Sequence, residues 1–482
     1  MNYRFLVPVL VAALFAAAPT PARAAESRAI VYATDFGSGS INTVAFGPPR
    51  TPACDLANVC SDAVLRFAPP FLFVVERFGC DNIRELDPIT FAPIGQFSVG
   101  NGSNPNDIYA ISESKAYVTR YDSPDLWVVN PLSRTFVKAI SLTAFADADG
   151  IPEMNRITYH ADRIFVSCQR LDRNNFFTPT DSSLVVVIDV QTDQFVDCDP
   201  VAPGVQGILL PRTNPTTEFA TAPDGVFLLG CTGAYGVNDG GVVAVDPRTL
   251  TANTVEVTEA QLGGDVNDVA VGPGASGFAK VFCVISDASF NTNLVSYTRV
   301  ALPVVASVYP ATGFVLADAE VNDRDEVWLC DRTVSAPGMR VFSATTGAQL
   351  STGAISTCLP PSDIVFDVIE PVAVSPGPAP AGPAGVSLAG IAPNPAAGRT
   401  AQAIQLRASA AGSLEVRIVN AAGRAIRTWR LEAGPGETVL TWDGADDAGR
   451  AAPAGVYLVH ANQAGRPGAA SARLVRLAPA RL

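Results

Sequence analysis

Three aspartates lie within five positions of the segment WDGADDAGR, at Asp443, Asp446 and Asp447. Such a cluster could be a metal loop, a catalytic acid pair or a turn. A calcium loop of the EF-hand type needs acids at alternate positions and a Glu at the twelfth. Counted from Asp443, the third position is Ala445 and the twelfth is Ala454. Because Asp caps nearby amides and Gly accepts a positive φ, the segment predicts a hairpin turn without metal or catalytic chemistry.

A second set of polar residues stands at the start of short apolar strands, in NPNDIYAIS, PEMNRITYH, DVNDVAVGP and PPSDIVFDV. They are Asn106, Asp107, Asn155, Arg156, Asn267, Asp268 and Asp363. Carboxylates and amides repeated in this way could hold a divalent cation or a polar ligand. They could equally cap turn amides and hydrate a narrow channel, and we favour this second role. We treat them as candidate binding residues at a channel mouth, and expect no catalytic residue, no metal and no cofactor.

Nine cysteines lie between positions 54 and 358. The odd number leaves at least one cysteine unpaired. Cys54 and Cys60 in CDLANVC are near enough in sequence to close a small loop, and we predict that pair as a candidate disulfide. There is no CxxC and there are only two histidines, His160 and His460, which argues against a zinc site. Several other cysteines sit in apolar runs such as VFCVIS, where a small buried side chain is expected.

The elements that would position these residues follow from an internal repeat. Seven stretches share a pattern of an apolar strand, a polar turn, a second strand and a third strand; they cover 29–46, 72–99, 115–142, 163–198, 225–257, 280–308 and 326–353. A polar step into a further apolar strand follows several copies. Four short strands at a spacing of about 40–55 residues are typical of a propeller blade. The sequence therefore predicts an all-β fold with a seven-bladed β-propeller over 25–369; six or eight blades stay open, because two copies are degenerate.

Two of these stretches carry a family resemblance. AYVTR with LWVVNPLSRTFVKAISL, and VVAVDPRTL, resemble the YVTN-type β-propeller repeat. The resemblance implies the fold over roughly 29–366. It implies little about function, because propellers include binding proteins, scaffolds, lyases and oxidoreductases.

The C-terminal part has a different composition. Residues 370–387 are rich in Pro and Gly and predict an extended linker. Residues 388–482 alternate apolar and polar residues in short strands and predict a small Ig-like β-sandwich, with Val416, Ile418, Trp429, Leu440, Trp442, Val456, Tyr457 and Leu458 as its core. The order of APNP, VRIVNAAGR and WDGADDAGRAAPAGVY resembles the Ig-like domain of the flagellar hook-capping protein and the related type IX secretion sorting domains. That resemblance implies contact with sorting machinery.

Charge and the N-terminus limit where the protein acts. Residues 1–24 have a charged start, an apolar run and the ARA cleavage pattern, which predicts a signal peptide and an extracytoplasmic, secreted or cell-surface protein. No other segment is apolar enough to span a membrane. The chain has a formal net charge of −13, with an acidic body and an Arg-rich C-terminal part. Nucleic-acid binding needs clustered cations, so we exclude it.

Three classes of function agree with these features. The first is an exported, non-enzymatic propeller that binds or scaffolds and carries a sorting or anchoring domain, and we favour it. The second is an enzyme, either a metal-dependent lactonase or lyase or a quinone-dependent dehydrogenase. A lyase would need a channel His, for which only His160 is near, and a quinone would need repeated Trp docking, for which the body has only Trp127 and Trp328. The third is an adhesin or polymer-binding module, marked by an exposed aromatic row.

Overall fold

The computed structural model describes residues 28–180, 182–272, 278–300, 303–367, 386–392, 394, 396–397, 401–408, 410–420, 424–434, 436–453, 455–463 and 469–477. The predicted signal peptide and most of the predicted linker lie outside these ranges. The chain divides into two compact units, Met1–Glu370 and Pro371–Leu482, and each is described by itself. No helix in the described part of the chain has the length and apolar character to cross a membrane.

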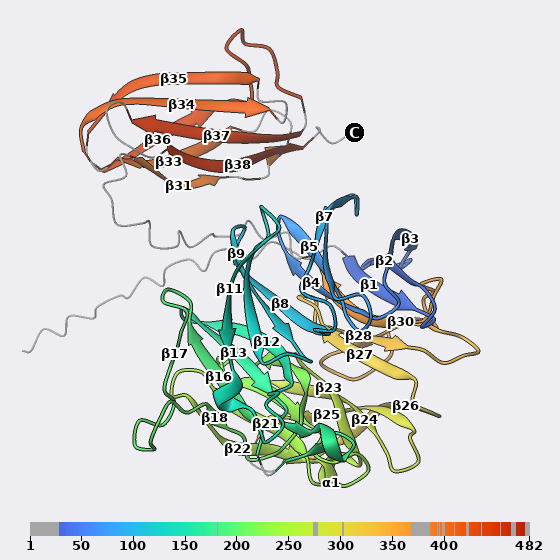
Figure 1. Ribbon diagram of the computed structural model, residues 1–482. Coiled ribbons are helices and arrows are strands. Elements are labelled where there is room, and N and C mark those ends of the chain that lie inside the picture. The colour runs from blue at the N-terminus through green and yellow to red at the C-terminus, as the bar shows by residue number, and fades with distance from the viewer. Residues whose placement is uncertain are drawn as a thin grey trace, which may run out of the picture. The chain divides into compact units, whose positions relative to one another are not determined.

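The first unit consists of antiparallel sheets that share one strand order from the innermost strand outwards (Figure 1). The first sheet contains β30 (Pro361–Phe366), β1 (Arg28–Thr34), β2 (Gly39–Ala45) and β3 (Pro52–Val59). The second contains β4 (Ala63–Ala68), β5 (Phe71–Glu76), β6 (Asn82–Leu86) and β7 (Pro93–Ser98), and the third contains β8 (Pro105–Ser112), β9 (Lys115–Arg120), β10 (Asp125–Asn130) and β11 (Thr135–Ser141). The fourth contains β12 (Met154–His160), β13 (Arg163–Cys168) and β16 (Leu184–Asp189), and both β17 (Gln194–Phe195) and β18 (Ile208–Leu209) pair with β16.

Three further sheets complete the series in the described residues. They are β19 (Pro215–Thr221), β20 (Phe227–Cys231), β21 (Gly241–Asp246), β22 (Thr251–Thr258); β23 (Asp265–Gly272), β24 (Lys280–Ser286), β25 (Thr292–Thr298), β26 (Ala306–Ala311); and β27 (Leu316–Val321), β28 (Glu326–Asp331), β29 (Gly338–Ser343). Short elements interrupt them: the pair β14 (Leu171–Asp172) and β15 (Thr178–Pro179), the 3₁₀ turns Thr143–Phe145 and Arg173–Asn175, and α1 (Glu259–Leu262).

The innermost strands lie side by side in a series that closes on itself, from β30 through β4, β8, β12, β19, β23 and β27 back to β30. This is a β-propeller. Its hydrophobic clusters lie between neighbouring sheets; one of them joins Tyr117 and Val128 of one sheet to Ile164 and Val186 of the next. The second strand of each sheet is buried along its length, as in β5 (FLFVVE), because both of its faces meet a neighbouring sheet. One sheet alone could not bury both faces, so the sheets depend on each other.

Chain closure joins the two ends of this unit. β30 pairs with β1, with Val31 opposite Ile364, so the first sheet takes its innermost strand from the C-terminal end of the unit. Two disulfides lie near the closure: Cys54–Cys358, with Cα atoms 6.1 Å apart, and Cys60–Cys80, with Cα atoms 6.7 Å apart. The other five cysteines are free.

The predicted Cys54–Cys60 disulfide is therefore wrong. Cys54 lies within β3, and Cys60 directly follows the end of the strand at Val59. Each of the two thiols is instead bonded to another cysteine, Cys54 to Cys358 and Cys60 to Cys80. Proximity in sequence is a poor guide to pairing when the intervening residues are extended.

The second unit has two sheets, as in a β-sandwich. One contains β31 (Val386–Ala392), β33 (Gln402–Ala408) and β36 (Gly436–Trp442); the other contains β32 (Ala396–Ala397), β38 (Ala469–Leu477), β37 (Gly455–Gln463), β34 (Gly412–Asn420) and β35 (Ala425–Ala433). Of the core expected from the sequence, Val416, Ile418, Trp442 and Tyr457 are buried, and Trp429 and Leu440 pack against them. Leu458 is 41% exposed, because it follows Tyr457 on a strand whose residues face alternate sides; the structure does not describe the side chain of Val456.

The first prediction concerns the disulfides. Replacing Cys54 and Cys358 with Ser removes a cross-link between residues 304 positions apart, and replacing Cys60 and Cys80 removes one between residues 20 apart. If the bonds act by constraining the unfolded chain, the losses in the free energy of unfolding should be roughly 5 and 3 kcal/mol. Denaturant unfolding of oxidised protein measures both. Peptide mapping without reduction should find these two pairs, and a Cys54–Cys60 peptide would contradict them.

The second prediction concerns the sandwich core. Trp442 is fully buried, its indole Nε1 donates to the carbonyl of Ala445 at 2.7 Å, and its ring meets that of Tyr457 with centroids 5.4 Å apart. Trp442→Ala should lower the free energy of unfolding of the second unit by roughly 3–5 kcal/mol. Hydrogen exchange of β33 and β36 in the full chain measures this. The exposed Leu458→Ala is the matched control and should change it by less than about 0.5 kcal/mol; equal effects would contradict the buried position of Trp442.

Candidate functional site

The aspartate cluster of the second unit forms a turn, as the sequence predicted. Asp443 Oδ1 accepts the amide of Ala445 at 3.0 Å, and Asp446 Oδ1 accepts those of Ala448 and Arg450 at 3.0 and 2.9 Å. Gly449 has a φ of +77°. These carboxylate oxygens are used by backbone amides of the turn itself, which leaves the cluster without the open geometry of a metal or acid–base site.

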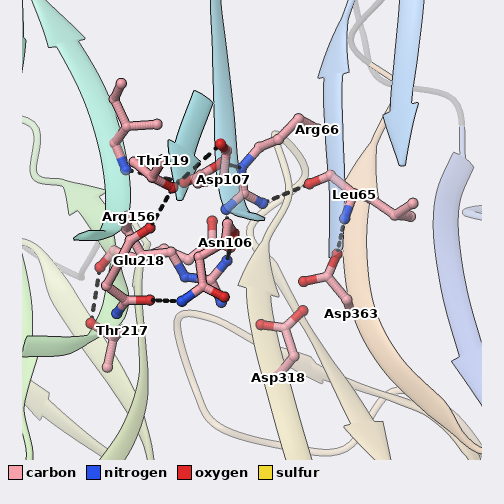
Figure 2. A network of polar contacts seen from close by, with 12 residues as sticks. Leu65, Arg66, Asn106, Asp107, Thr119, Arg156, Thr217, Glu218, Asp318 and Asp363 are labelled. Atoms are coloured by element: carbon pink, nitrogen blue, oxygen red, sulfur yellow. Dashed lines mark hydrogen bonds and ion pairs between the residues drawn. The ribbon is translucent and has the colours of Figure 1, made fainter. Parts of the chain in front are cut away.

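The seven candidate residues of the first unit all lie on innermost strands. Asn106 and Asp107 are on β8, Asn155 and Arg156 on β12, Asn267 and Asp268 on β23, and Asp363 on β30. The fold therefore brings residues far apart in sequence to the centre of the propeller. Figure 2 shows several of them converging with residues from strands that the sequence reasoning had not identified.

Four charged residues were missed by that reasoning. They are Arg66 on β4, Glu218 on β19, and Asp318 and Glu320 on β27. Their strands, AVLRFA, PTTEFAT and LADAEV, lack the paired Asn and Asp that marked the others. The repeat itself carried a usable signal. Because an innermost strand should precede each copy, a charged residue in the short apolar run before a copy is expected at the centre of the propeller.

Arg66 is the hub of the charge network (Figure 2). Its Nε lies 2.5 Å from Asp107 Oδ1, and its Nη2 lies 2.6 Å from Glu218 Oε1. Burial disfavours the charged guanidinium, but the two carboxylates outweigh burial and hold the pKa of Arg66 well above its usual value. Burial would likewise raise the pKa of Glu218, and Arg66 and Arg156 reverse this and lower it. Arg66 and Glu218 are therefore both charged at neutral pH.

Aspartates at the centre also join one innermost strand to the next. The Oδ2 of Asp363 accepts a hydrogen bond from the amide of Leu65 at 2.6 Å, and the Oδ2 of Asp107 accepts one from the amide of Ile157 at 3.1 Å. The Oδ2 of Asp268 accepts one from the amide of Ala319 at 2.9 Å, and the Oδ2 of Asp318 accepts one from the amide of Ile364 at 2.8 Å. In each case donor and acceptor belong to neighbouring sheets. These aspartates thus cap amides of the neighbouring blade's innermost strand, whereas the expectation was that they cap amides of turns.

The remaining junctions use other side chains. Asn155 Nδ2 donates to the carbonyls of Pro215 and Thr216 at 2.9 and 3.0 Å. Thr232 Oγ1 donates to the carbonyl of Val266 at 2.6 Å. Asn267 is the exception among the candidates, since its Nδ2 has no hydrogen-bond partner in the described residues.

Carboxyl groups outnumber cations on one side of the centre. Burial, with repulsion from Glu218, raises the pKa of Asp268 to about 7 and that of Asp363 to about 6. Burial and neighbouring carboxylates raise the pKa values of Asp318 and Glu320 well above their usual range. Asp268 and Asp363 therefore take up protons near neutral pH, and the raised pKa values of all four groups reduce the negative charge of the centre. No three His, Cys, Asp or Glu side chains in the described residues are placed to share a metal ion.

Nucleophiles and bases of the usual kind are remote from the centre or inert. His160 ends β12 and its ring meets that of Phe227, at the opposite end of the strand from Asn155 and Arg156. Cys168 and Cys283 are buried, and burial raises the pKa of each thiol far above neutrality. A low-pKa thiolate or a central histidine is therefore absent from the described residues.

A cavity of about 380 Å³ opens at the start of the innermost strands. The strands contribute Asn106, Asn155, Arg156 and Thr216, and the loops around them contribute Asp62, Arg77, Phe78, Asn104, Tyr121, Gln169 and Tyr235. Arg77 pairs with Asp62 at 2.6 Å, and Tyr121 donates to Gln169 Oε1 at 2.6 Å. The Nε of Arg156 has no partner in the described residues. The cavity thus offers amides, hydroxyls, aromatic rings and the ion pair of Asp62 and Arg77 to a ligand.

The third prediction is a pH dependence of stability. The raised pKa values mean that the folded state binds more protons than the unfolded state between about pH 4 and 7, so stability should fall as pH rises through this window. Asp318→Asn keeps an oxygen acceptor for the amide of Ile364 but removes the charge. This variant should be more stable than the natural protein at pH 8 and lose that advantage at pH 4, as measured by denaturant midpoints.

Asp107→Asn is the matched control for this prediction. It also keeps an oxygen acceptor, but it breaks the buried pair with Arg66 and should cost roughly 3–5 kcal/mol at pH 8, where Asp318→Asn stabilises. A natural protein that gains stability between pH 5 and 8, or an Asp318→Asn variant that is destabilised at pH 8, would contradict the uneven charge at the centre.

The sequence and the fold were compared with known proteins. Residues 394–466 match the family of FlgD Ig-like domains, which accords with the resemblance seen in the sequence. None of the curated proteins with which the sequence was compared matches it. The YVTN repeat and the type IX sorting domain stay predictions.

Among solved structures, PorZ, described as an essential bacterial surface component of the type IX secretion system of Porphyromonas gingivalis, is 14% identical over 91% of this chain and 63% of its own, with a TM-score of 0.42. This chain thus spans less than two thirds of PorZ. AztD from Citrobacter koseri is 12% identical over 71% of this chain and 98% of its own, with a TM-score of 0.40. Streptogramin B lyase is 9% identical over 64% and 91%, with a TM-score of 0.41. Likeness at this level carries no argument about function.

Proposed function

We propose that this chain is an exported, non-enzymatic β-propeller that binds a ligand at the open end of its centre and is sorted or anchored by its C-terminal domain. One observation carries the proposal. The polar groups at the centre are used to join blades, whereas the cavity beside them offers hydrogen-bonding and aromatic groups, and its carboxylate, Asp62, is held by Arg77. Such a cavity suits recognition better than reaction.

The enzyme alternatives need groups that are missing from the described part of the cavity. A lyase would need a central base, and His160 lies at the other end of β12. A quinone-dependent enzyme would need accessible Trp rings, but Trp328 is fully buried and Trp127 packs on Phe136 with ring centroids 4.6 Å apart. The carboxyls with raised pKa values lie between blades, where capping of the next strand already accounts for Asp268, Asp318 and Asp363.

The C-terminal unit supports attachment. Its match to FlgD Ig-like domains and the Pro- and Gly-rich residues before it favour a separate module on an extended tether. The predicted signal peptide favours export, and the Arg-rich composition of residues 388–482 beside an acidic body favours contact with an anionic surface or with export machinery. The resemblance to type IX sorting domains adds the expectation of a cell-surface destination.

The fourth prediction tests this assignment. Deleting residues 388–482 should leave the propeller with an unchanged thermal midpoint and move it from the cell surface into the medium or the periplasm. The measurement is fractionation of cells of the source species with an antibody to the propeller, since only these cells are certain to hold the matching machinery.

Trp442→Ala in the full chain provides a control that keeps the length and charge of the domain. If the folded domain is the sorting element, this variant should be partly mislocalised in the same direction as the deletion. An unchanged location of the deleted protein would remove the sorting role, and an intact Met1 on the soluble protein would remove export through the predicted signal.

A further inference from the structure

An aromatic side chain stands exposed at the tip of the same loop in most blades. The loop joins the second strand of each sheet, counted from the centre, to the third. The aromatic residues are Phe36, Phe78, Phe176, Tyr235 and Phe290, with exposed fractions of 76, 74, 93, 66 and 64%. Large apolar side chains scattered singly on a surface are ordinary, but their recurrence at one topological position is not.

These loops lie around the cavity. The loop between the second and third strands is at the end of the sheet where the innermost strand begins, because neighbouring strands are antiparallel. Phe78 and Tyr235 themselves line the cavity, together with Tyr121, which occupies the corresponding loop of another blade. Two of the five exposed rings thus line the cavity, and the other three stand on the corresponding loops of other blades, at the same end of the sheets. We call this set of five rings the aromatic rim.

The backbone at three of the tips is strained. Phe36, Phe176 and Phe290 have φ values of 67°, 54° and 59°, in the left-handed region that bulky residues avoid. Phe91 adopts a similar φ of 59° elsewhere in the propeller, but it is only 3% exposed, so burial of its ring offsets the strain. The three rim residues have no such compensation. Strain retained without a packing reason is expected at a binding site.

The tips are held by fixed turns. Asp35 Oδ1 accepts the amides of Gly37 and Ser38 at 2.9 and 2.7 Å, and the guanidinium of Arg332 lies over the ring of Phe36 at 4.6 Å. Asp287 caps the turn of Phe290 in the same way. The rings are thus presented on ordered loops, which lowers the entropic cost of binding.

Three kinds of partner could meet this surface: a lipid membrane, a folded protein or a carbohydrate. An anionic membrane is disfavoured by the net charge of −13. A folded protein is disfavoured because polar residues separate the rings, whereas the buried core of a protein interface is a continuous apolar patch. A sugar chain presents alternating C–H faces and hydroxyl edges, which match separate rings and a polar cavity.

The charge of the cavity refines this choice. Arg77 is neutralised by Asp62, and Arg156 lies 3.5 Å from Glu218. The remaining groups that line the cavity are side-chain amides and hydroxyls, such as those of Asn104, Asn106 and Thr216. Because the charges cancel, the cavity matches an uncharged ligand.

We propose that the aromatic rim and the cavity it surrounds bind a neutral carbohydrate polymer. The rings of several blades stack on successive sugar units, and the side-chain amides and hydroxyls hydrogen-bond one unit in the cavity. This inference rests on the proposed function as a binding propeller and assigns the class of its ligand.

The test uses the mature full chain and a printed array of neutral, N-acetylated and uronic-acid oligosaccharides, followed by calorimetric titration with the best neutral hexasaccharide. The variant combines Phe36→Asn, Phe176→Asn and Phe290→Asn. Asn tolerates a positive φ, so the thermal midpoint should stay the same or rise. Affinity for the hexasaccharide should fall at least tenfold. Gain of stability with loss of binding is a result that a purely structural role of these rings would not give.

Leu132→Asn is the matched control. Leu132 is 60% exposed in the turn between β10 and β11, at the opposite end of the blade, and its replacement should leave affinity unchanged. Absence of binding to every neutral oligosaccharide, equal binding by the triple variant, or a preference for uronic acids would overturn the inference. Binding to anionic vesicles by the natural chain but not by the triple variant would also overturn it. None of these results affects the localisation test, so failure of the ligand class and failure of the proposed function are distinguishable.

Discussion

The inner edges of the blades impose the constraint on which this propeller depends. Each innermost strand pairs with its own sheet on one side only, and the described sheets form no backbone ladder with one another. Its other edge would leave buried amides unpaired at the centre, at a cost of about 1–3 kcal/mol for each group. Aspartates of the neighbouring strand accept four of these amides, from Leu65, Ile157, Ala319 and Ile364. Side chains thus replace the backbone bonds that join strands within a sheet.

These hydrogen bonds place several carboxyl groups in the buried centre of the propeller. Their charge is compensated differently on the two sides of the centre. On one side Arg66 pairs with Asp107 and Glu218, and burial of Glu218 is outweighed by Arg66 and Arg156, which lower its pKa. On the other side, no ion pair joins Asp268 or Asp318 to a cation among the described residues, and burial with repulsion from nearby carboxylates raises the pKa of each. A protonated carboxyl still has a free carbonyl oxygen, so it can keep accepting the amide of the next strand. Capping therefore survives the loss of charge.

Much of the fold was predictable because short apolar strands alternate with turn residues in each copy of the repeat. The centre was only half predictable. Asp107 and Asp363 stood out because each sits at the polar start of an apolar strand, whereas Arg66 and Glu218 are single charges within short runs, and their partners lie 41 and 152 residues away. The cross-links between blades are equally non-local: Cys54 pairs with Cys358, and no local pattern in CDLANVC indicates that partner. The periodicity of the sequence predicts the strands of each blade. The contacts between blades join residues far apart in sequence and are seen only in the structure.

The same architecture separates stability from recognition. The bonds that join blades come largely from the innermost strands, while the loops that carry Phe36 and Phe290 begin one strand further out and are closed by their own Asx turns. Substitution at a tip therefore leaves the bonds at the centre intact. A strained, exposed ring can persist there because the strands on either side, such as β24 and β25, are held by burial on both faces. The rim can differ in sequence from blade to blade, as Tyr235 and Phe290 do, while Asp107, Asp268, Asp318 and Asp363 have little freedom to change, since each completes the edge of a neighbouring strand.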